Sequence, residues 1–172
     1  MFGHLKSWLN QKNPIGYLAQ HSLFNFSRIS KRIKAEEGFR SFVYKDKLGN
    51  PTIGYGHLIN SNDFYSVKKR YSKTTLTEVF YNDLRRAIFD FKKNYHYKTL
   101  PNTTQEIIIE MIFQLGIRKV LKFKKFNFYI KNKQFYLAAF EMMKSRWYLQ
   151  TPKRANKLII FLLQYNDRPQ RK

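Results

Sequence analysis

The chain has 172 residues and a formal net charge of +22, because 33 Lys and Arg residues outnumber 11 Asp and Glu residues. Its length allows one sizeable core or two small lobes, and its 43% apolar content argues against global disorder. Cysteine is absent, which excludes disulfides, thiolate metal sites and a cysteine nucleophile. No apolar run approaches the roughly 20 residues that a membrane-spanning helix needs.

The positive charge predicts attraction to polyanions, but it does not choose among nucleic acid, an anionic membrane surface and anionic cell-envelope polymers. An AT-rich genome would also enrich Phe, Tyr, Ile, Asn and Lys, so composition alone is an equal explanation of the basicity. We expect no cofactor and no metal, because the histidines are scattered without ligand spacing: His4, His21, His57 and His96.

Residues 1–26 are expected to form an N-terminal extension. Asn13-Pro14-Ile15-Gly16 interrupts any helix, and the apolar residues show no long period. The segment also lacks the apolar core and cleavage site of a secretory signal, so export would need outside help. No acid precedes Glu36, so a basic membrane-surface segment is the alternative to a loosely packed tail.

Residues 27–72 are expected to form a lobe that carries a hairpin. A helix is predicted from Ser27 to Glu37, with Ser27 or Ser30 as its cap and Gly38 as its stop. Strand-forming residues follow at 42–44 and 52–55, separated by the turn Leu48-Gly49-Asn50-Pro51. This pattern predicts a small antiparallel hairpin.

The rest of the chain is helical by pattern. The capping box Thr75-x-x-Glu78 predicts a linking helix over 75–95, and Thr103-x-x-Glu106 predicts the start of another helix. Thr151-Pro152 predicts a last helix that reaches about Tyr165. Residues 100–166 are therefore expected to form a helical lobe, followed by a basic tail over 167–172.

Three of the 11 acidic residues fall close together, at Glu36, Glu37 and Asp46. Glycoside hydrolysis needs one carboxyl group as proton donor and a second that activates water or attacks the sugar. Glu37 lies near a predicted helix C-terminus, where the dipole and partial burial favour the protonated acid. Asp46 is expected to be hydrated and ionised, and Glu36 to be surface charge. A helix end followed by a charged hairpin, with no catalysis, is the alternative.

The residues around this pair resemble a known family. The segments Glu37-Gly38-x-Arg40, Tyr44-Lys45-Asp46 and Thr52-Ile53-Gly54-x-Gly56-His57 are similar to the active-site segments of phage-type lysozymes, especially the T-even type, in glycoside hydrolase family 24. The family spacing from Glu to Asp to Thr, nine and then six residues, is kept here. The resemblance resumes at residues 111–116 and 144–155, and it departs most between residues 57 and 75.

The resemblance implies an α+β, mostly helical two-lobe lysozyme-like fold with a small antiparallel β-hairpin lobe. It implies an N-acetylmuramidase that acts on the β-1,4 bonds of bacterial peptidoglycan. Glu37 would be the general acid, Asp46 the second carboxylate, and Thr52 would help to hold the attacking water. The family outcome would be inversion at the anomeric carbon.

The resemblance also implies supporting contacts. His57 would pair with Asp83, and Arg154 would pair with Glu37. Gln114 and Trp147 match a family pair near the cleft, with either a structural or a substrate role. Family sugar contacts map onto four further positions, of which the last two differ from the small polar residues usual there: Leu58, Phe113, Phe126 and Glu141.

Three functions remain open at this stage. The first is a monomeric endolysin that stays in the host cytoplasm until lysis and then acts on the cell wall, with anionic envelope polymers as possible partners. The second is a lysozyme carried in the virion. The third is a basic module that binds polyanions, although the retained carboxylates argue against nucleic acid as the main partner.

Overall fold

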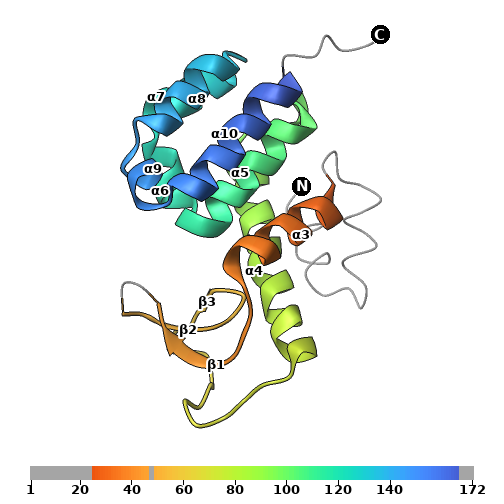
Figure 1. Ribbon diagram of the computed structural model, residues 1–172. Helices are drawn as coiled ribbons and strands as arrows, with labels where there is room; N and C mark the ends of the chain where they lie inside the picture. Colours follow the sequence, from red (N-terminus) through yellow and green to blue (C-terminus); the bar gives the residue numbers. More distant parts are fainter. Residues whose placement is uncertain (1–24, 47–48, 167–172) are drawn as a thin grey trace.

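Figure 1 shows the computed structural model, which describes residues 25–46 and 49–166. A small sheet lies at one end of the molecule and a group of helices at the other, and the long helix α4 (Lys73–Asn94) runs between them. The predicted α+β fold, mostly helical with a small antiparallel sheet, is confirmed. The expected basic tail and nearly all of the expected N-terminal extension lie outside the described residues.

Helix α3 (Phe26–Glu37) begins one residue earlier than predicted, and both predicted caps are wrong. The side chain of Asn25 accepts a hydrogen bond from the backbone N–H of Arg28 at 2.9 Å, which satisfies a free donor of the first turn. Ser30 lies inside the helix, where its buried hydroxyl donates to the carbonyl of Phe26 at 2.7 Å. Phe26 is buried, so the folded part begins just before the predicted boundary.

The sheet has three antiparallel strands in the order β1 (Arg40–Lys45), β2 (Pro51–Gly54) and β3 (His57–Leu58). The predicted hairpin of β1 and β2 is confirmed, whereas the two-residue strand β3 was not predicted. Thr52 in the central strand stands opposite Tyr44 on one side and Leu58 on the other. This register brings three motif segments of the sequence together.

Helix α4 confirms the predicted linking helix, but its capping residue is different. Ser72, not Thr75, is the cap, and its hydroxyl accepts from the backbone N–H of Thr75 at 3.0 Å. The apolar residues that are spaced along one face of this helix are buried: Leu76, Phe80, Leu84, Ala87, Ile88 and Phe91.

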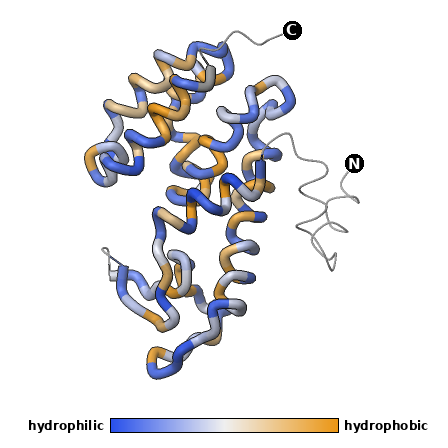
Figure 2. The backbone as a smooth tube through the Cα atoms, turned by 45° about the vertical axis from the view of Figure 1, so that its right-hand side comes forward, coloured by the Kyte–Doolittle hydropathy of each residue, from blue (hydrophilic) through white to orange (hydrophobic). Residues whose placement is uncertain are grey.

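The helical group is built around α5 (Asn102–Leu115), whose ten residues from Thr103 to Ile112 are all buried. Helices α4 and α10 (Pro152–Asn166) pack against it, and Figure 2 shows hydrophobic segments inside this group. The remaining helical elements are shorter: η1 (Tyr97–Thr99), α6 (Ile117–Lys122), α7 (Lys124–Lys131), α8 (Phe135–Met143) and α9 (Arg146–Gln150). None of the helices in the described ranges combines the length and the apolar character of a membrane span.

A buried ion cluster joins α3 to α5. Arg28 and Arg32 both contact Glu106, at 2.6 Å and 3.0 Å, and Arg32 also pairs with Glu110. The backbone N–H of Asn25 donates to Glu106 as well, at 3.0 Å. The predicted capping box at Thr103 and Glu106 is therefore wrong, because the two arginines and this backbone group occupy the Glu106 carboxylate. Burial raises the pKa of Glu110, although the charge of Arg32 opposes this shift.

Candidate active site

Glu37 is the last residue of α3, and its carboxylate is held from the helical side of the molecule. Arg154 in α10 donates from Nη1 to Oε1 of Glu37 at 2.5 Å, so the predicted contact is present. The two side chains are largely buried, with 21% of Glu37 and 11% of Arg154 exposed. The neighbouring Glu36 contacts Lys157 instead, at 2.5 Å. The two adjacent glutamates therefore have different partners, although both partners lie in α10.

The other oxygen of Glu37 lies against the turn between β2 and β3. Gly56 in this turn has φ of 82°, and a Cβ placed on it would lie 2.9 Å from Oε2 of Glu37. A glycine is therefore needed for two reasons, its left-handed backbone and the close approach of the carboxylate. The spacing of the motif residues did not assign a role to Gly56. The Gly-x-Gly pattern, however, is a signal that another group lies close to the backbone.

Asp46 and Thr52 are organised by Asn50, which the sequence reasoning missed. Asp46 accepts from the backbone N–H of Asn50 at 2.8 Å and from its side-chain amide at 3.1 Å. The hydroxyl of Thr52 donates to the carbonyl oxygen of Asn50 at 3.0 Å, and Thr52 is buried with 2% exposure. An Asx-type arrangement in a turn with Asp and Asn four residues apart is the signal that could have identified Asn50.

The charges of Glu37 and Asp46 both affect the pKa of the Tyr44 hydroxyl. Burial is the main reason that the pKa of Tyr44 is raised, and the charges of Glu37 and Asp46 raise it further, while Arg40 opposes them. The Arg40 guanidinium stands over the Tyr44 ring, 4.4 Å from its centroid. Both carboxylates therefore lie close enough to the Tyr44 hydroxyl to raise its pKa.

His57 in β3 is held between two aspartates. Its Nδ1 lies 2.7 Å from Asp83 in α4, the predicted partner, and its Nε2 lies 3.2 Å from Asp63, which was not predicted. The hydrogen bond with Asp83 is the main cause that raises the pKa of His57, while burial lowers it and Asp63 adds a further rise. Both ring nitrogens face carboxylates, which favours the imidazolium form. This contact ties the sheet to α4.

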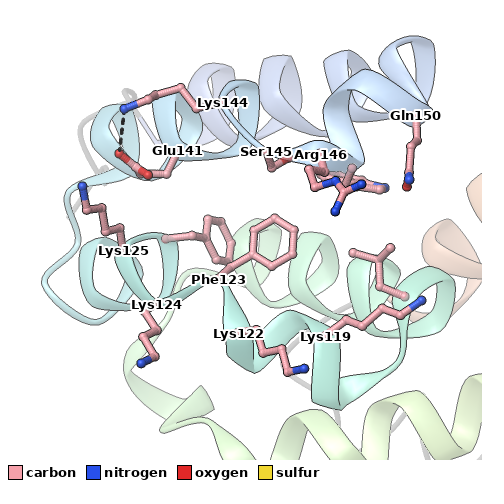
Figure 3. A pocket seen from close by; sticks show the side chains of 13 residues that line it. Lys119, Lys122, Phe123, Lys124, Lys125, Glu141, Lys144, Ser145, Arg146 and Gln150 are labelled. Atoms are coloured by element: carbon pink, nitrogen blue, oxygen red, sulfur yellow. Dashed lines mark ion pairs between the residues drawn. The ribbon is translucent and has the colours of Figure 1, made fainter.

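On the helical side, Trp147 in α9 donates from its indole N–H to the Gln114 side chain at 3.1 Å, so the predicted pair is present. Trp147 is 4% exposed and lies at the edge of a pocket of about 770 Å³ between α6 and α7 on one side and α8 and α9 on the other (Figure 3). In the described parts of the chain, no group of acidic and histidine side chains is arranged to hold a metal ion.

The four predicted sugar contacts have different environments. Leu58 is 56% exposed, whereas Phe113 is partly buried and packs on Phe80 with ring centroids 5.5 Å apart. Glu141 lines the pocket and lies 3.9 Å from Lys144. Phe126 also borders the pocket but is 1% exposed, because its ring belongs to the helical core. The ring of Phe126 therefore has no open face for the sugar contact that the family resemblance implies.

Comparison with known proteins agrees with this geometry. The profile of the family described as phage lysozyme matches residues 34–159. Probable T4-type lysozymes 1 and 2 of Dictyostelium discoideum are 35% and 31% identical to the chain over 156 residues, and each alignment covers 77% of this chain and 92% of the relative. The pre-baseplate central spike protein Gp5 of Enterobacteria phage T4 is 29% identical over 160 residues, or 80% of this chain and 28% of that protein.

The fold, the glutamate at the end of α3 and these similarities define a glycoside hydrolase of the lysozyme type. The chain belongs to the phage lysozyme family. Peptidoglycan is the substrate that membership of this family implies.

Proposed function

We propose that the protein is an N-acetylmuramidase that hydrolyses the β-1,4 bond between N-acetylmuramic acid and N-acetylglucosamine in peptidoglycan. The observation that carries this proposal is that two carboxylates, Glu37 at the end of α3 and Asp46 directly after β1, are held by separate partners. Glu37 is held by Arg154, while Asp46 is held by Asn50. Two carboxylates with different environments can take separate acid and base roles.

In the proposed reaction Glu37 transfers its proton to the glycosidic oxygen as the bond to the anomeric carbon breaks. Asp46 takes a proton from a water molecule, and the water oxygen forms the new bond on the opposite face of the sugar. Thr52 has an oxygen that can still accept a hydrogen bond, since its own proton is donated to Asn50. It would position the water, and the product would have the inverted anomeric configuration.

Digestion of purified peptidoglycan tests this mechanism. Glu37→Gln should lower the rate by about 10²- to 10⁴-fold, because the variant has no acidic proton to donate. Glu36→Gln is the matched control, since it changes the adjacent glutamate, which contacts Lys157. Reducing N-acetylmuramic acid ends that first appear as the α anomer would support inversion. Ends that first appear as the β anomer would instead support retention through a covalent intermediate at Asp46. Unchanged lysis by Glu37→Gln would remove the mechanism.

We further propose that the enzyme is a monomeric endolysin, held in the host cytoplasm until lysis and then active on the cell wall. The second candidate is a virion-borne lysozyme, which the similarity to a T4 protein called a central spike protein favours. Mass spectrometry of purified particles separates the two, because only the second candidate predicts the chain in the particle. Size-exclusion chromatography with light scattering tests the monomer.

A further inference from the structure

The pocket between α6–α7 and α8–α9 has a strongly one-sided charge. Its rim carries six cationic side chains and one acid, Glu141, with the cations at Lys119, Lys122, Lys124, Lys125, Lys144 and Arg146. Figure 3 shows the amines of Lys119, Lys122 and Lys124 on one side of the opening and Lys144 and Arg146 on the other. All six side chains line the same pocket, which has a volume of about 770 Å³.

These cations are not neutralised by the protein itself. Among the described residues, these six cations make one ion pair, in which Nζ of Lys144 lies 3.9 Å from Oε1 of Glu141. Five cations around one opening repel one another, and an anion in the pocket relieves that repulsion. The floor is apolar, with the partly buried Phe123 beside Trp147. The pocket thus combines a positive rim with a surface suited to a carbon backbone.

We propose that this pocket binds the phosphate groups of an anionic polyol-phosphate polymer of the cell envelope. Lysine acts on phosphate as a point charge with little directional demand, which suits the repeated phosphates of a flexible polymer. Base stacking, which single-stranded nucleic acid binding uses, needs open ring faces. Of the three aromatic rings at this pocket, Trp147 and Phe126 are 4% and 1% exposed and Phe123 is partly buried, so at most one ring offers a face for stacking. Glu141, at a position that the family resemblance assigns to sugar, borders the same pocket.

This inference goes beyond hydrolysis and does not depend on which bond is cut, so binding alone tests it. The probe is soluble poly(glycerol phosphate), titrated into the full chain by calorimetry at several salt concentrations. The test variant changes four exposed lysines of the rim to glutamine: Lys119, Lys122, Lys124 and Lys125. The control variant makes the same change at four exposed lysines elsewhere: Lys31, Lys93, Lys98 and Lys131.

The rim variant should bind the polymer about tenfold or more weakly than the control variant, although both lose the same net charge. If each rim lysine neutralises one phosphate, the slope of log affinity against log salt should become shallower by roughly 3. Equal weakening in both variants would overturn the proposal, because the whole-molecule field would then explain the binding. Rim-dependent binding that is tighter for single-stranded DNA of matched charge would also overturn it, in favour of a nucleic-acid site.

Discussion

Replacing Gly56 with alanine tests whether the position of the Glu37 carboxylate controls the rate. A Cβ at Gly56 would lie 2.9 Å from Oε2 of Glu37, whereas ordinary contact begins at 3.4 Å. Because Oε2 ends a flexible side chain, we expect the carboxylate to move by roughly 0.5 Å while the turn stays in place. A displacement of about 1 Å can cost a catalytic group 100-fold in rate. We therefore expect kcat on peptidoglycan to fall about tenfold.

The control for this variant must carry the same backbone strain without the contact. Gly116 meets that need, since its φ is 78° and no atom lies within 4 Å of a Cβ placed there. Alanine at either glycine should lower the free energy of unfolding by about 1 to 3 kcal/mol, measured in urea, because both residues have a positive φ that strains a side chain. Only Gly56→Ala should then lose turnover. Equal turnover in the two folded variants would refute the argument that the Gly56 approach positions Glu37.

Three further variants test the contacts around the site. Asp83→Asn should lower the stability most below about pH 6.5, because Asp83 raises the pKa of His57 in the folded state. The stabilisation is complete below the unfolded pKa of His57 and is lost as pH rises through the folded pKa. A difference in melting temperature between variant and wild type that stays constant from about pH 5 to 8 would contradict this. Glu106→Gln should lower the unfolding free energy by about 1 to 3 kcal/mol in urea, because Arg28 and Arg32, which are both partly exposed, lose their hydrogen bonds to a buried carboxylate. A loss below about 0.5 kcal/mol would mean that the cluster is neutral for stability. Gln114→Leu should lower the free energy of unfolding by about 1 to 3 kcal/mol, because the buried indole N–H of Trp147 loses its acceptor. An unchanged melting temperature would mean that the indole has found another acceptor.

The sequence predicted the helices and the hairpin because their periodicity is local. The long helix α4 and the last helix α10 were predicted within two residues of their observed ends, from start signals and helical patterns in the sequence. The contacts of Glu37 with Arg154 and of His57 with Asp83 came from the family resemblance, since 117 and 26 residues separate the partners. A local sequence pattern carries no information about contacts between residues that are so far apart in the chain.

The wrong caps of α3 and α4 were replaced by nearby residues, Asn25 and Ser72, but the wrong capping box at Glu106 was replaced by distant partners. Glu106 has the spacing of a capping box, but Arg28 and Arg32 reach it across more than 70 residues. The spacing itself held a signal, because Glu106 and Glu110 stand four residues apart, as do the two arginines. Matched pairs of opposite charge at one-turn spacing on two helices predict such a contact.

The contact between Glu37 and Arg154 also has a consequence for synthesis of the chain. The proton donor proposed here is made early, but the side chain that holds it lies 117 residues later, in the last helix. The ion cluster that holds α3 likewise requires Glu106, which is synthesised 78 residues after Arg28. Domains generally fold as units during synthesis, and an isolated hairpin is at best marginally stable in water. The Arg154 contact of Glu37 therefore forms only after the last helix has been made.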